Sequence, residues 1–437
     1  MLDLVLSDVT LPDGRVTDLS IRDGVVVHAG APERAHDTIP CHGLLCLPGA
    51  VDMHVHMRGG SQRGKEDWRT GSEAAVAGGV TLVVDQPNTV PPLTTPRVFA
   101  ARVEEARARS WCHFAVNAGV ASGSDPAALW RCGAMVFGEL FAAPSSYGDG
   151  IPLPDLARYL KQIASLGALA TIHAEQACEE VPEGLRAHDR LRSADGEVEA
   201  IREVRSRAGS RVPLHFCHVT SAEALAAAAP ASCEVTPHHL LLSREDFPDG
   251  DGFARVNPPL RSRAVQQGLL RAWDRIPVIA SDHAPHTWEE KRQPFTDAPA
   301  GLPGVETMVP LLVARVRAGE FSALSVAEKT SWNPAAVLGI PRAGYAPGER
   351  ADLALYPREG VTIRAEILHS RCGWTPFEGR EGIFPELVLL DGEVAYRRGE
   401  FTDAPARWFP GRVYIPGGST CEVCRNSAPI GPRPNKG

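Results

Sequence analysis

The 437-residue sequence is long enough to bury a large core and to form about two structural units, because single cores stop growing at roughly 250 to 300 residues. Hydrophobic residues make up 43% of the chain and charged residues 22%, which excludes a coiled coil or a largely disordered protein. The net charge of -8, without a basic cluster, argues against nucleic acid and anionic membranes as partners.

The first residues, Met1-Leu-Asp-Leu-Val-Leu-Ser-Asp8, carry acidic groups where a signal peptide carries basic ones. No apolar run approaches the roughly 20 residues of a membrane span. The ten cysteines are scattered without a disulfide framework, as is typical of a reducing compartment, so we expect a cytoplasmic protein. Cys421 and Cys424 form a single pair, and a zinc ribbon needs a second one. We therefore assign them to a loose tail at 416–437.

Residues 1–48 and the residues from 342 onward share a pattern of short strands and turns. Strands are predicted at 2–9, 18–21, 25–27, 351–356, 387–390 and 393–396. Asp23-Gly24 and Asp391-Gly392 are typical hairpin turns. The simplest account is one small β-domain made of residues 1–48 and 342–415, which the middle of the chain interrupts.

Between residues 49 and 341, apolar runs alternate with helical segments, which is typical of βα units in a parallel sheet. The runs lie at 50–56, 80–85, 113–120, 134–140, 168–173, 213–219, 233–238 and 277–281. Helices are predicted at 68–77, 96–109, 153–166, 196–208, 221–229 and 264–274. Eight strands close a (β/α)8 barrel of the TIM type, so we predict an α/β fold. A doubly wound open sheet is the alternative, but it would not gather eight strand ends around one cavity.

Ligand-type side chains stand where these runs end, which in a barrel is the active-site face. His54, His56 and Arg58 alternate along the first strand and therefore share one face. Further polar residues follow the other runs, namely Asn88, Glu139, His173, His218, Asn257, Asp282 and His286. Imidazoles and carboxylates together suit zinc, with manganese or cobalt as alternatives, and there are enough of them for two ions. Metal-activated water would hydrolyse a carbonyl compound.

Several motifs carry a resemblance that covers nearly all of residues 1–415. They are Pro48-Gly-Ala-Val-Asp-Met-His-Val-His-Met-Arg58, Lys65-Glu-Asp67, Gln86-Pro-Asn-Thr89, His173-Ala-Glu175, Val235-Thr-Pro-His-His-Leu240 and Ser281-Asp-His-Ala-Pro-His286. The chain resembles the dihydroorotases, which are cyclic amidohydrolases of the amidohydrolase superfamily. The resemblance implies a barrel with a β-sandwich built from both chain ends. It also implies zinc-dependent, reversible conversion between L-dihydroorotate and N-carbamoyl-L-aspartate in pyrimidine synthesis.

The resemblance also implies roles for the metal-ligand residues. His54, His56 and Asp282 would hold one zinc ion, and His173 and His218 the other. Asp282 would also be the catalytic residue that moves a proton from the attacking water to the leaving nitrogen.

The substrate would be bound by four residues at the same strand ends. Arg58, Asn88 and His286 would hold its carboxylate, and Asn257 its ring. The chemistry agrees, because a guanidinium can bind a carboxylate through two parallel hydrogen bonds.

Glu139 is a departure from many relatives, which place a carbamylated lysine at the end of the fourth strand. The five lysines here, at positions 65, 161, 291, 329 and 436, all lie elsewhere. We expect Glu139 to be a metal ligand that can bridge two cations. In the alternative reading it pairs with an arginine.

The other histidines at these strand ends have simpler expected roles. His215 lies three residues before His218, so a regular strand points the two side chains to opposite sides. His238 and His239 are expected to be hydrogen-bonded supports. Glu175 shares the face of His173 and is expected to orient it.

Two classes of alternative function remain. Allantoinases and dihydropyrimidinases or hydantoinases share the metal layout, but Arg58 and Asn88 favour a substrate that carries a carboxylate. A catalytically inactive dihydroorotase-like scaffold is the alternative from another class, and the intact ligand set disfavours it. The resemblance allows self-association and association with an aspartate transcarbamoylase, besides the small-molecule substrate.

Overall fold

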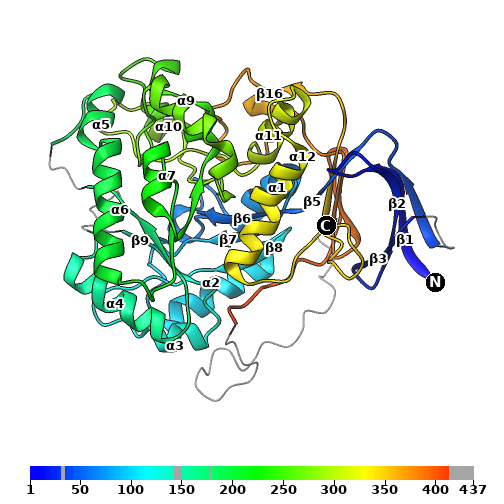
Figure 1. The fold of residues 1–437 in the computed structure, drawn as a ribbon, viewed down its shortest axis with the longest axis horizontal. Helices are drawn as coiled ribbons and strands as arrows, with labels where there is room; N and C mark the ends of the chain where they lie inside the picture. Colours follow the sequence, from blue (N-terminus) through cyan, green and yellow to red (C-terminus); the bar gives the residue numbers. More distant parts are fainter. Residues whose placement is uncertain (31–34, 142–149, 177–179, 413–437) are drawn as a thin grey trace.

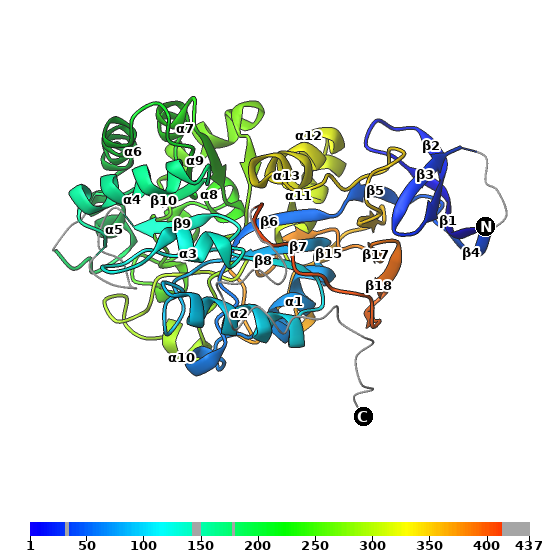
Figure 2. The same ribbon diagram turned by 90° about the horizontal axis from the view of Figure 1, so that it is seen from below.

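Eight short parallel strands in the middle of the chain form a closed barrel. The computed structural model describes residues 1–30, 35–141, 150–176 and 180–412. The barrel strands are β6 (Ala50–Val55), β7 (Val80–Asp85), β8 (His113–Val116), β9 (Phe137–Phe141), β10 (Ala170–His173), β11 (Leu214–Phe216), β12 (Ser232–Val235) and β13 (Val278–Ile279). They form a three-stranded and a five-stranded sheet. Parallel bridges from Ala118 to Phe137 and from Val55 to His283 join the two sheets at both edges. The predicted TIM-like barrel is therefore confirmed (Figures 1 and 2).

Helices surround the barrel and explain why its strands are apolar on both faces. The helices are α1 (Trp68–Ala77), α2 (Pro96–Arg109), α3 (Pro126–Arg131), α4 (Leu153–Ser165), α5 (Leu185–Leu191), α6 (Ala194–Ala208), α7 (Ala222–Ala228), α8 (Pro237–Leu241), α9 (Arg263–Arg271), α10 (Trp288–Lys291), α11 (Met308–Arg317), α12 (Ala323–Ala327) and α13 (Asn333–Leu338). Every residue of β6 and β7 is buried, as expected for strands covered on both sides. Side-chain oxygens of Asp67, Thr95 and Ser221 cap the first turns of α1, α2 and α7.

Both ends of the chain contribute strands to one nine-stranded sheet. Its strands are β1 (Leu2–Thr10), β2 (Val16–Arg22), β3 (Val25–Ala29), β4 (Ala35–Pro40), β5 (Leu45–Pro48), β14 (Leu353–Tyr356), β17 (Leu387–Leu390), β18 (Glu393–Arg397) and β19 (Glu400–Phe401). The two chain ends meet where β5 pairs antiparallel with β14. Leu6, Leu19, Leu353 and Leu389 pack in one core cluster. The predicted β-sandwich from both chain ends is confirmed, and Figure 2 shows its blue and orange strands beside the barrel.

The barrel and this sheet are joined by buried polar contacts. Asp352 precedes β14, and its Oδ1 accepts a hydrogen bond from Nε2 of His113, the first residue of β8, at 3.3 Å. Arg350 pairs with the other oxygen of Asp352 at 2.7 Å. We propose residues 48/49 and 341/342 as the borders between the two units. A separate two-stranded ribbon consists of β15 (Val361–Thr362) and β16 (Glu381–Gly382).

Several predicted strands were too long. The runs 213–219 and 277–281, for example, form strands only at Leu214–Phe216 and Val278–Ile279. The run 233–238 forms a strand only to Val235, and Pro237 then begins α8, with Thr236 as its N-cap. His238 and His239 therefore lie on a helix, because Thr followed by Pro is a helix start. The run 113–120 is a strand only to Val116. The tail at 416–437, with Cys421 and Cys424, lies outside the described residues.

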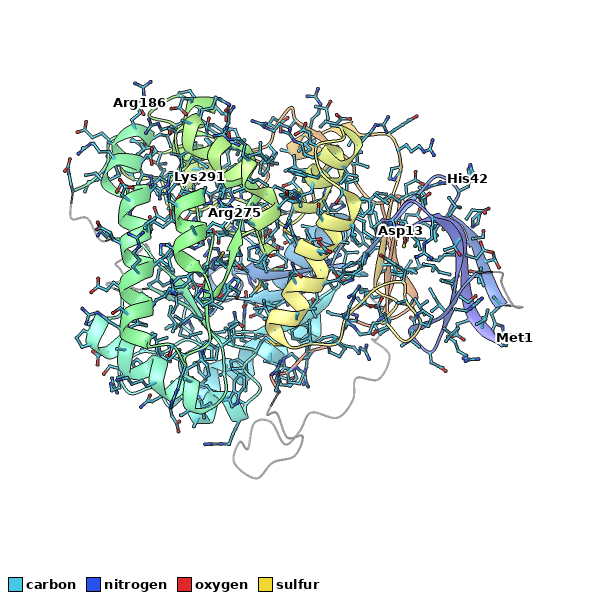
Figure 3. All side chains as sticks on the ribbon, viewed as in Figure 1. Met1, Asp13, His42, Arg186, Arg275 and Lys291 are labelled. Carbon is cyan, nitrogen blue, oxygen red and sulfur yellow. The ribbon has the colours of Figure 1, made fainter. Side chains whose placement is uncertain are left out.

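Side chains fill the space between the helices and the barrel, as Figure 3 shows. Lys291 lies inside this packing and is fully buried, whereas Arg186 on α5 is exposed. In the described ranges, every helix is too short or too polar to cross a membrane.

Candidate metal centre and substrate pocket

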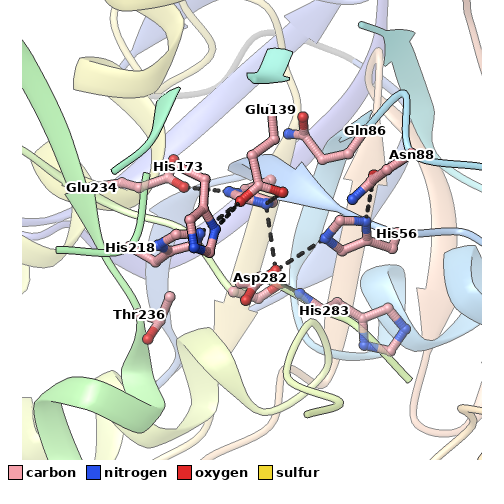
Figure 4. Close-up of polar contacts among 12 residues, drawn as sticks. His56, Gln86, Asn88, Glu139, His173, His218, Glu234, Thr236, Asp282 and His283 are labelled. Atoms are coloured by element: carbon pink, nitrogen blue, oxygen red, sulfur yellow. Dashed lines mark hydrogen bonds and ion pairs between the residues drawn. The ribbon is translucent and has the colours of Figure 1, made fainter. Parts of the chain in front are cut away.

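Six predicted ligand residues meet at the carboxyl ends of the barrel strands. His54 and His56 come from the end of β6, Glu139 from β9, His173 from β10, and His218 and Asp282 from the loops after β11 and β13. Figure 4 labels five of them around one point, namely His56, Glu139, His173, His218 and Asp282. Each of the six is at most 6% exposed. The structure thus brings these residues together in a site that excludes bulk water.

The His54 ring directs its Nε2 into this cluster. Its Nδ1 lies 2.5 Å from Oε1 of Glu234. Burial opposes ionisation of Glu234, but His54 and His215 hold its pKa well below the ordinary value. The ionised carboxylate accepts the Nδ1 proton, so Nε2 points inward. Burial opposes protonation of His54, but Glu234 and Asp282 raise its pKa well above the ordinary value, so an ion that binds at Nε2 must displace a proton. Buried Nε2 lacks a hydrogen-bond partner and lies 3.4 Å from Asp282 Oδ1 and 3.6 Å from Glu139 Oε2.

The His56 ring is oriented in the same way. Its Nδ1 donates to Oδ1 of Asn88 at 3.0 Å, since an amide oxygen only accepts. The other nitrogen, Nε2, lies 3.1 Å from Oδ1 of Asp282. Burial lowers the pKa of His56, which keeps the ring neutral. Two electron-pair donors therefore face each other, as ligands of one cation do.

Glu139 lies between the remaining histidines. Its Oε1 is 2.8 Å from Nδ1 of His173 and 2.8 Å from Nε2 of His218. Burial would raise the pKa of Glu139, but His54, His173 and His218 hold it well below the ordinary value. Its partners in the described part of the chain are histidines, which disfavours the alternative in which it pairs with an arginine.

The donor set fits divalent cations. The ligand atoms of His54, His56 and Glu139 lie within 4.8 Å of one another, as do those of Glu139, His173 and His218. The two groups share Glu139, which has two oxygens to offer. Nitrogen and oxygen donors in this number suit zinc-type ions.

Glu175 anchors His173 from the other side, as expected. Its Oε2 lies 2.6 Å from Nε2 of His173 and 2.5 Å from Nη1 of Arg192. Burial opposes the ionised form, but Arg192 and His173 lower the pKa of Glu175 to about 2. The paired carboxylates raise the pKa of His173 to about 9 against the effect of burial. An ion that binds here must therefore displace a proton.

A cationic pocket borders the metal-ligand cluster. Arg58 is 2% exposed, and its Nε donates to the carbonyl of Pro285 at 3.2 Å. Its Nη2 lies 3.4 Å from Nε2 of His286. Burial, Arg58 and Lys65 lower the pKa of His286 to about 3, so this ring is neutral. Asn88 contributes a buried Nδ2 without a hydrogen-bond partner.

Asn257 also borders the cluster. It lines a small cavity of about 30 Å³ together with His56, Glu139, His173 and Asp282. Nε2 of His188, a residue of α5, donates to its Oδ1 at 2.9 Å, which leaves the amide nitrogen to face the cavity. A larger cleft of about 840 Å³ leads inward past residues that include Lys65, Asn88, Glu139, Tyr159 and His286. Its volume is typical of small-molecule sites.

Three site residues have left-handed backbone conformations. The φ angles are 48° at Arg58, 35° at His218 and 46° at Asp282. Such angles in residues with a side chain are strained and cluster at functional sites. The strain turns each side chain toward the cavity just beyond a strand end.

The other histidines take supporting positions. His215 Nδ1 lies 2.7 Å from Ser232 Oγ, and its Nε2 lies 3.0 Å from Glu234 Oε2. His239 contacts Thr236 Oγ1 at 2.8 Å and the carbonyl of Pro258 at 2.9 Å, as predicted for a support. His238 differs, because its buried Nε2 has no hydrogen-bond partner.

Sequence reasoning missed Glu234, which orients both His54 and His215. A signal was present, because a carboxylate inside an apolar strand is costly unless it is paired. His188 was also missed, and its sequence neighbourhood carries no such signal.

The chain is similar to known proteins over most of its length. The amidohydrolase family matches residues 45–367. A dihydroorotase from Methanosarcina acetivorans is 38% identical over 427 residues, covering 90% of this chain and 91% of that protein. A dihydroorotase from Halobacterium salinarum is 39% identical over 407 residues, with 90% and 96% covered.

Solved structures show the same fold. An L-hydantoinase (dihydropyrimidinase) from Arthrobacter aurescens has a TM-score of 0.84 at 25% identity, covering 92% of this chain and 98% of that chain. A dihydropyrimidinase from Brevibacillus agri has a TM-score of 0.82 at 23% identity, with 95% and 100% covered.

Proposed function

The chain belongs to the amidohydrolase family. Because the curated relatives described above are dihydroorotases, we propose that it is a dihydroorotase, a metal-dependent cyclic amidohydrolase. The reaction is the reversible hydrolysis of L-dihydroorotate to N-carbamoyl-L-aspartate, a step of pyrimidine biosynthesis. The observation that supports this best is the position of Arg58 beside the metal-ligand cluster. A cyclic amide with a carboxylate substituent matches a site in which a guanidinium adjoins metal ligands.

We propose two zinc ions per chain. His54, His56 and Asp282 would hold one, His173 and His218 the other, and Glu139 both. Bound zinc supplies polarisation of the ring carbonyl and a water molecule that is nucleophilic near neutral pH.

The chain's own groups move the proton. Asp282 is poised as an ionised base, because His54 and His56 lower its pKa against the effect of burial. Its carboxylate takes the proton of the attacking water and delivers it to the ring nitrogen as the amide bond breaks. In the reverse direction, Asp282 removes the proton from the carbamoyl nitrogen.

Arg58, His286 and Asn88 bind the substrate carboxylate in this proposal. His286 is neutral, so Arg58 supplies the positive charge, while Nδ2 of Asn88 offers a further donor. The amide of Asn257, oriented by His188, would contact the ring. Together they hold the reacting amide against Asp282.

Steady-state rates with dihydroorotate, dihydrouracil, hydantoin and allantoin test this proposal. The second candidate is a dihydropyrimidinase or hydantoinase, favoured by the likeness to a solved L-hydantoinase (dihydropyrimidinase). Dihydroorotate should be turned over fastest. Faster turnover of any other substrate would refute our choice. An Asp282→Asn preparation controls for contaminating host enzyme.

Metal analysis separates the enzyme from an inactive scaffold. We expect about two zinc ions per chain, whereas a scaffold would contain less than about one and show no turnover.

Self-association and association with an aspartate transcarbamoylase are proposals that the family resemblance supports. Light scattering with and without an added transcarbamoylase tests both. A cytoplasmic location is proposed as well, supported by seven buried thiols in the described residues.

A further inference from the structure

Lys291 ends α10 as an ammonium group enclosed by main-chain oxygens. The residue is fully buried. Its Nζ donates to the carbonyl oxygens of Arg255 at 2.8 Å, Pro299 at 2.9 Å and Gly301 at 3.0 Å. These three acceptors match the three N–H donors of a protonated lysine. The Trp374 ring lies 5.5 Å from Nζ and adds a cation–π contact.

A buried lysine whose ammonium group binds main-chain carbonyls is unusual, because lysine is rarely fully buried. Burial lowers the pKa of Lys291 well below its ordinary value, so the charged form is costly here. Yet a neutral amine has only two N–H donors for the three carbonyl oxygens. The three acceptors match the ammonium form, whose three donors and positive charge compensate three carbonyl dipoles that point at one another.

The three carbonyls belong to two segments that form the substrate side of the site. Arg255 lies two residues before Asn257, and the Gly301 amide donates to the Arg255 carbonyl at 3.1 Å. Pro299 and Gly301 flank Ala300, whose carbonyl lies 3.1 Å from Nε2 of His286. Asn257, Ala300 and Gly301 all line the small cavity beside Asp282.

Gly252 shows how closely this region is packed. A β-carbon at position 252 would overlap the main-chain oxygen of Lys291. Arg255 fastens the same loop from outside, donating to the carbonyls of Thr296 and Ala298, both at 2.8 Å. Two cationic side chains, those of Arg255 and Lys291, therefore bind the main chain of segment 295–301, and Lys291 is the more deeply buried of the two.

We propose that Lys291 is a positioning residue for the substrate, holding the Asn257 segment and the Ala300 segment at a fixed spacing. The inference rests on the proposed function. Without the charge, the three carbonyls repel one another and the spacing of the two segments changes, although the Gly301–Arg255 hydrogen bond still links them. The metal ligands stay in place, because they stand at the ends of barrel strands that Lys291 does not contact.

The first test is a split between KM and kcat. Lys291→Met, which replaces the side chain with an uncharged one that is only one atom shorter, should raise KM for dihydroorotate about tenfold while kcat and zinc content change by less than about threefold. Lys329→Met is the matched control. Lys329 is also buried, and its Nζ donates to the carbonyl of Ile276 at 2.6 Å, away from the substrate side. Its kinetic constants should equal those of the wild type.

The second test is chemical rescue of Lys291→Ala, which leaves the three oxygens around an empty space. Potassium or ammonium ions should fill it, lowering KM about fivefold or more and raising the melting temperature, whereas lithium and tetramethylammonium should not. The same salts should leave Lys329→Ala unchanged. A thallium ion located among the three oxygens in crystals of Lys291→Ala would support the assignment directly.

Other results would overturn the proposal. An unchanged KM in Lys291→Met, or an equal loss of zinc and kcat, would exclude a substrate-positioning role. If neither Lys291 variant folds while both Lys329 variants do, Lys291 is a folding residue instead. Failure of the proposed function is distinguishable, because the wild type would then not turn over dihydroorotate. The effect of potassium or ammonium on the melting temperature of Lys291→Ala would still show whether a cation binds among the three carbonyl oxygens.

Discussion

Asp282 Oδ1 lies 3.1 Å from Nε2 of His56, although 226 residues separate them in the chain. The contact joins the first and last barrel strands at their carboxyl ends. The two groups also differ in ionisation, since the His56 ring is neutral and the Asp282 carboxylate is ionised. A base that is ionised, buried and next to metal ligands is equipped to accept a proton from water.

Asp282→Asn should abolish turnover while keeping the fold. The amide has nearly the same size as the carboxylate but cannot take a proton, so kcat should fall about a hundredfold or more. Circular dichroism and the melting temperature check that the protein is folded. Retention of more than about a tenth of wild-type kcat would remove Asp282 as the base.

Arg58→Met should weaken substrate capture more than metal binding. Arg58 contacts Pro285 and His286 at the edge of the cluster and is not one of the proposed metal ligands, so zinc content should stay constant. KM for dihydroorotate should rise about tenfold or more, since a charge-assisted pair is lost. Residual activity on dihydrouracil, which has no carboxylate, should not change. An equal effect on both substrates would contradict the carboxylate role.

Glu139→Gln should lower the zinc content. The amide keeps the size of the side chain but loses the charge that His173 and His218 share. Zinc should fall from about two ions to about one or fewer, with a matching loss of activity. Mass spectrometry of dialysed protein measures this. Glu105→Gln, which alters a salt bridge of Arg102 on α2, serves as the control.

Zinc binding should strengthen as pH rises from 6 to 9. The pKa of His173 is raised to about 9 in the structure, so below that value an incoming ion must displace its proton. Titration with zinc in a competing chelator should therefore release protons. A pH-independent affinity across this window would mean that His173 is not a ligand.

Asp352→Asn should destabilise the protein in a pH-dependent manner. Burial opposes ionisation of Asp352, but His113 and Arg350 lower its pKa from the ordinary 3.8 to about 2. A carboxyl with a lowered pKa stabilises the fold above pH 3.8, and this contribution is lost as pH falls towards 2. The variant should lose about 2 kcal/mol of unfolding free energy at neutral pH.

Urea unfolding of wild type and Asp352→Asn at several pH values measures the difference, which should shrink at the acid end. Glu203→Gln is the control, because the exposed Glu203–Arg207 pair should contribute about 0.5 kcal/mol or less. A difference that stays constant down to pH 2 would contradict the assignment.

The barrel could be predicted from the sequence because its strands are buried on both faces and read as apolar runs. The grouping of His54, Glu139, His173 and Asp282 followed from it, since parallel strands place their carboxyl ends together. The error at 233–238 arose because Val235-Thr-Pro continues an apolar run while starting a helix. Periodicity alone does not distinguish the two.

Other parts of the site depend on contacts between distant segments. His188 on α5 orients Asn257, and Lys291 binds the carbonyl of Arg255, yet neither pair shares a sequence pattern. The left-handed conformations of Arg58 and Asp282 are likewise invisible in the sequence. These features arise only when loops from different βα units pack together.

The pairing of β5 with β14 has a consequence for synthesis on the ribosome. Leu47 and Pro48 emerge early, but their partners Leu353 and Ala354 follow only after the whole barrel has been translated. Until then the nascent polypeptide exposes an unpaired strand edge with apolar side chains, which is prone to wrong association. Slow translation or truncation near the 3′ end of the message should therefore yield aggregation rather than a stable isolated barrel.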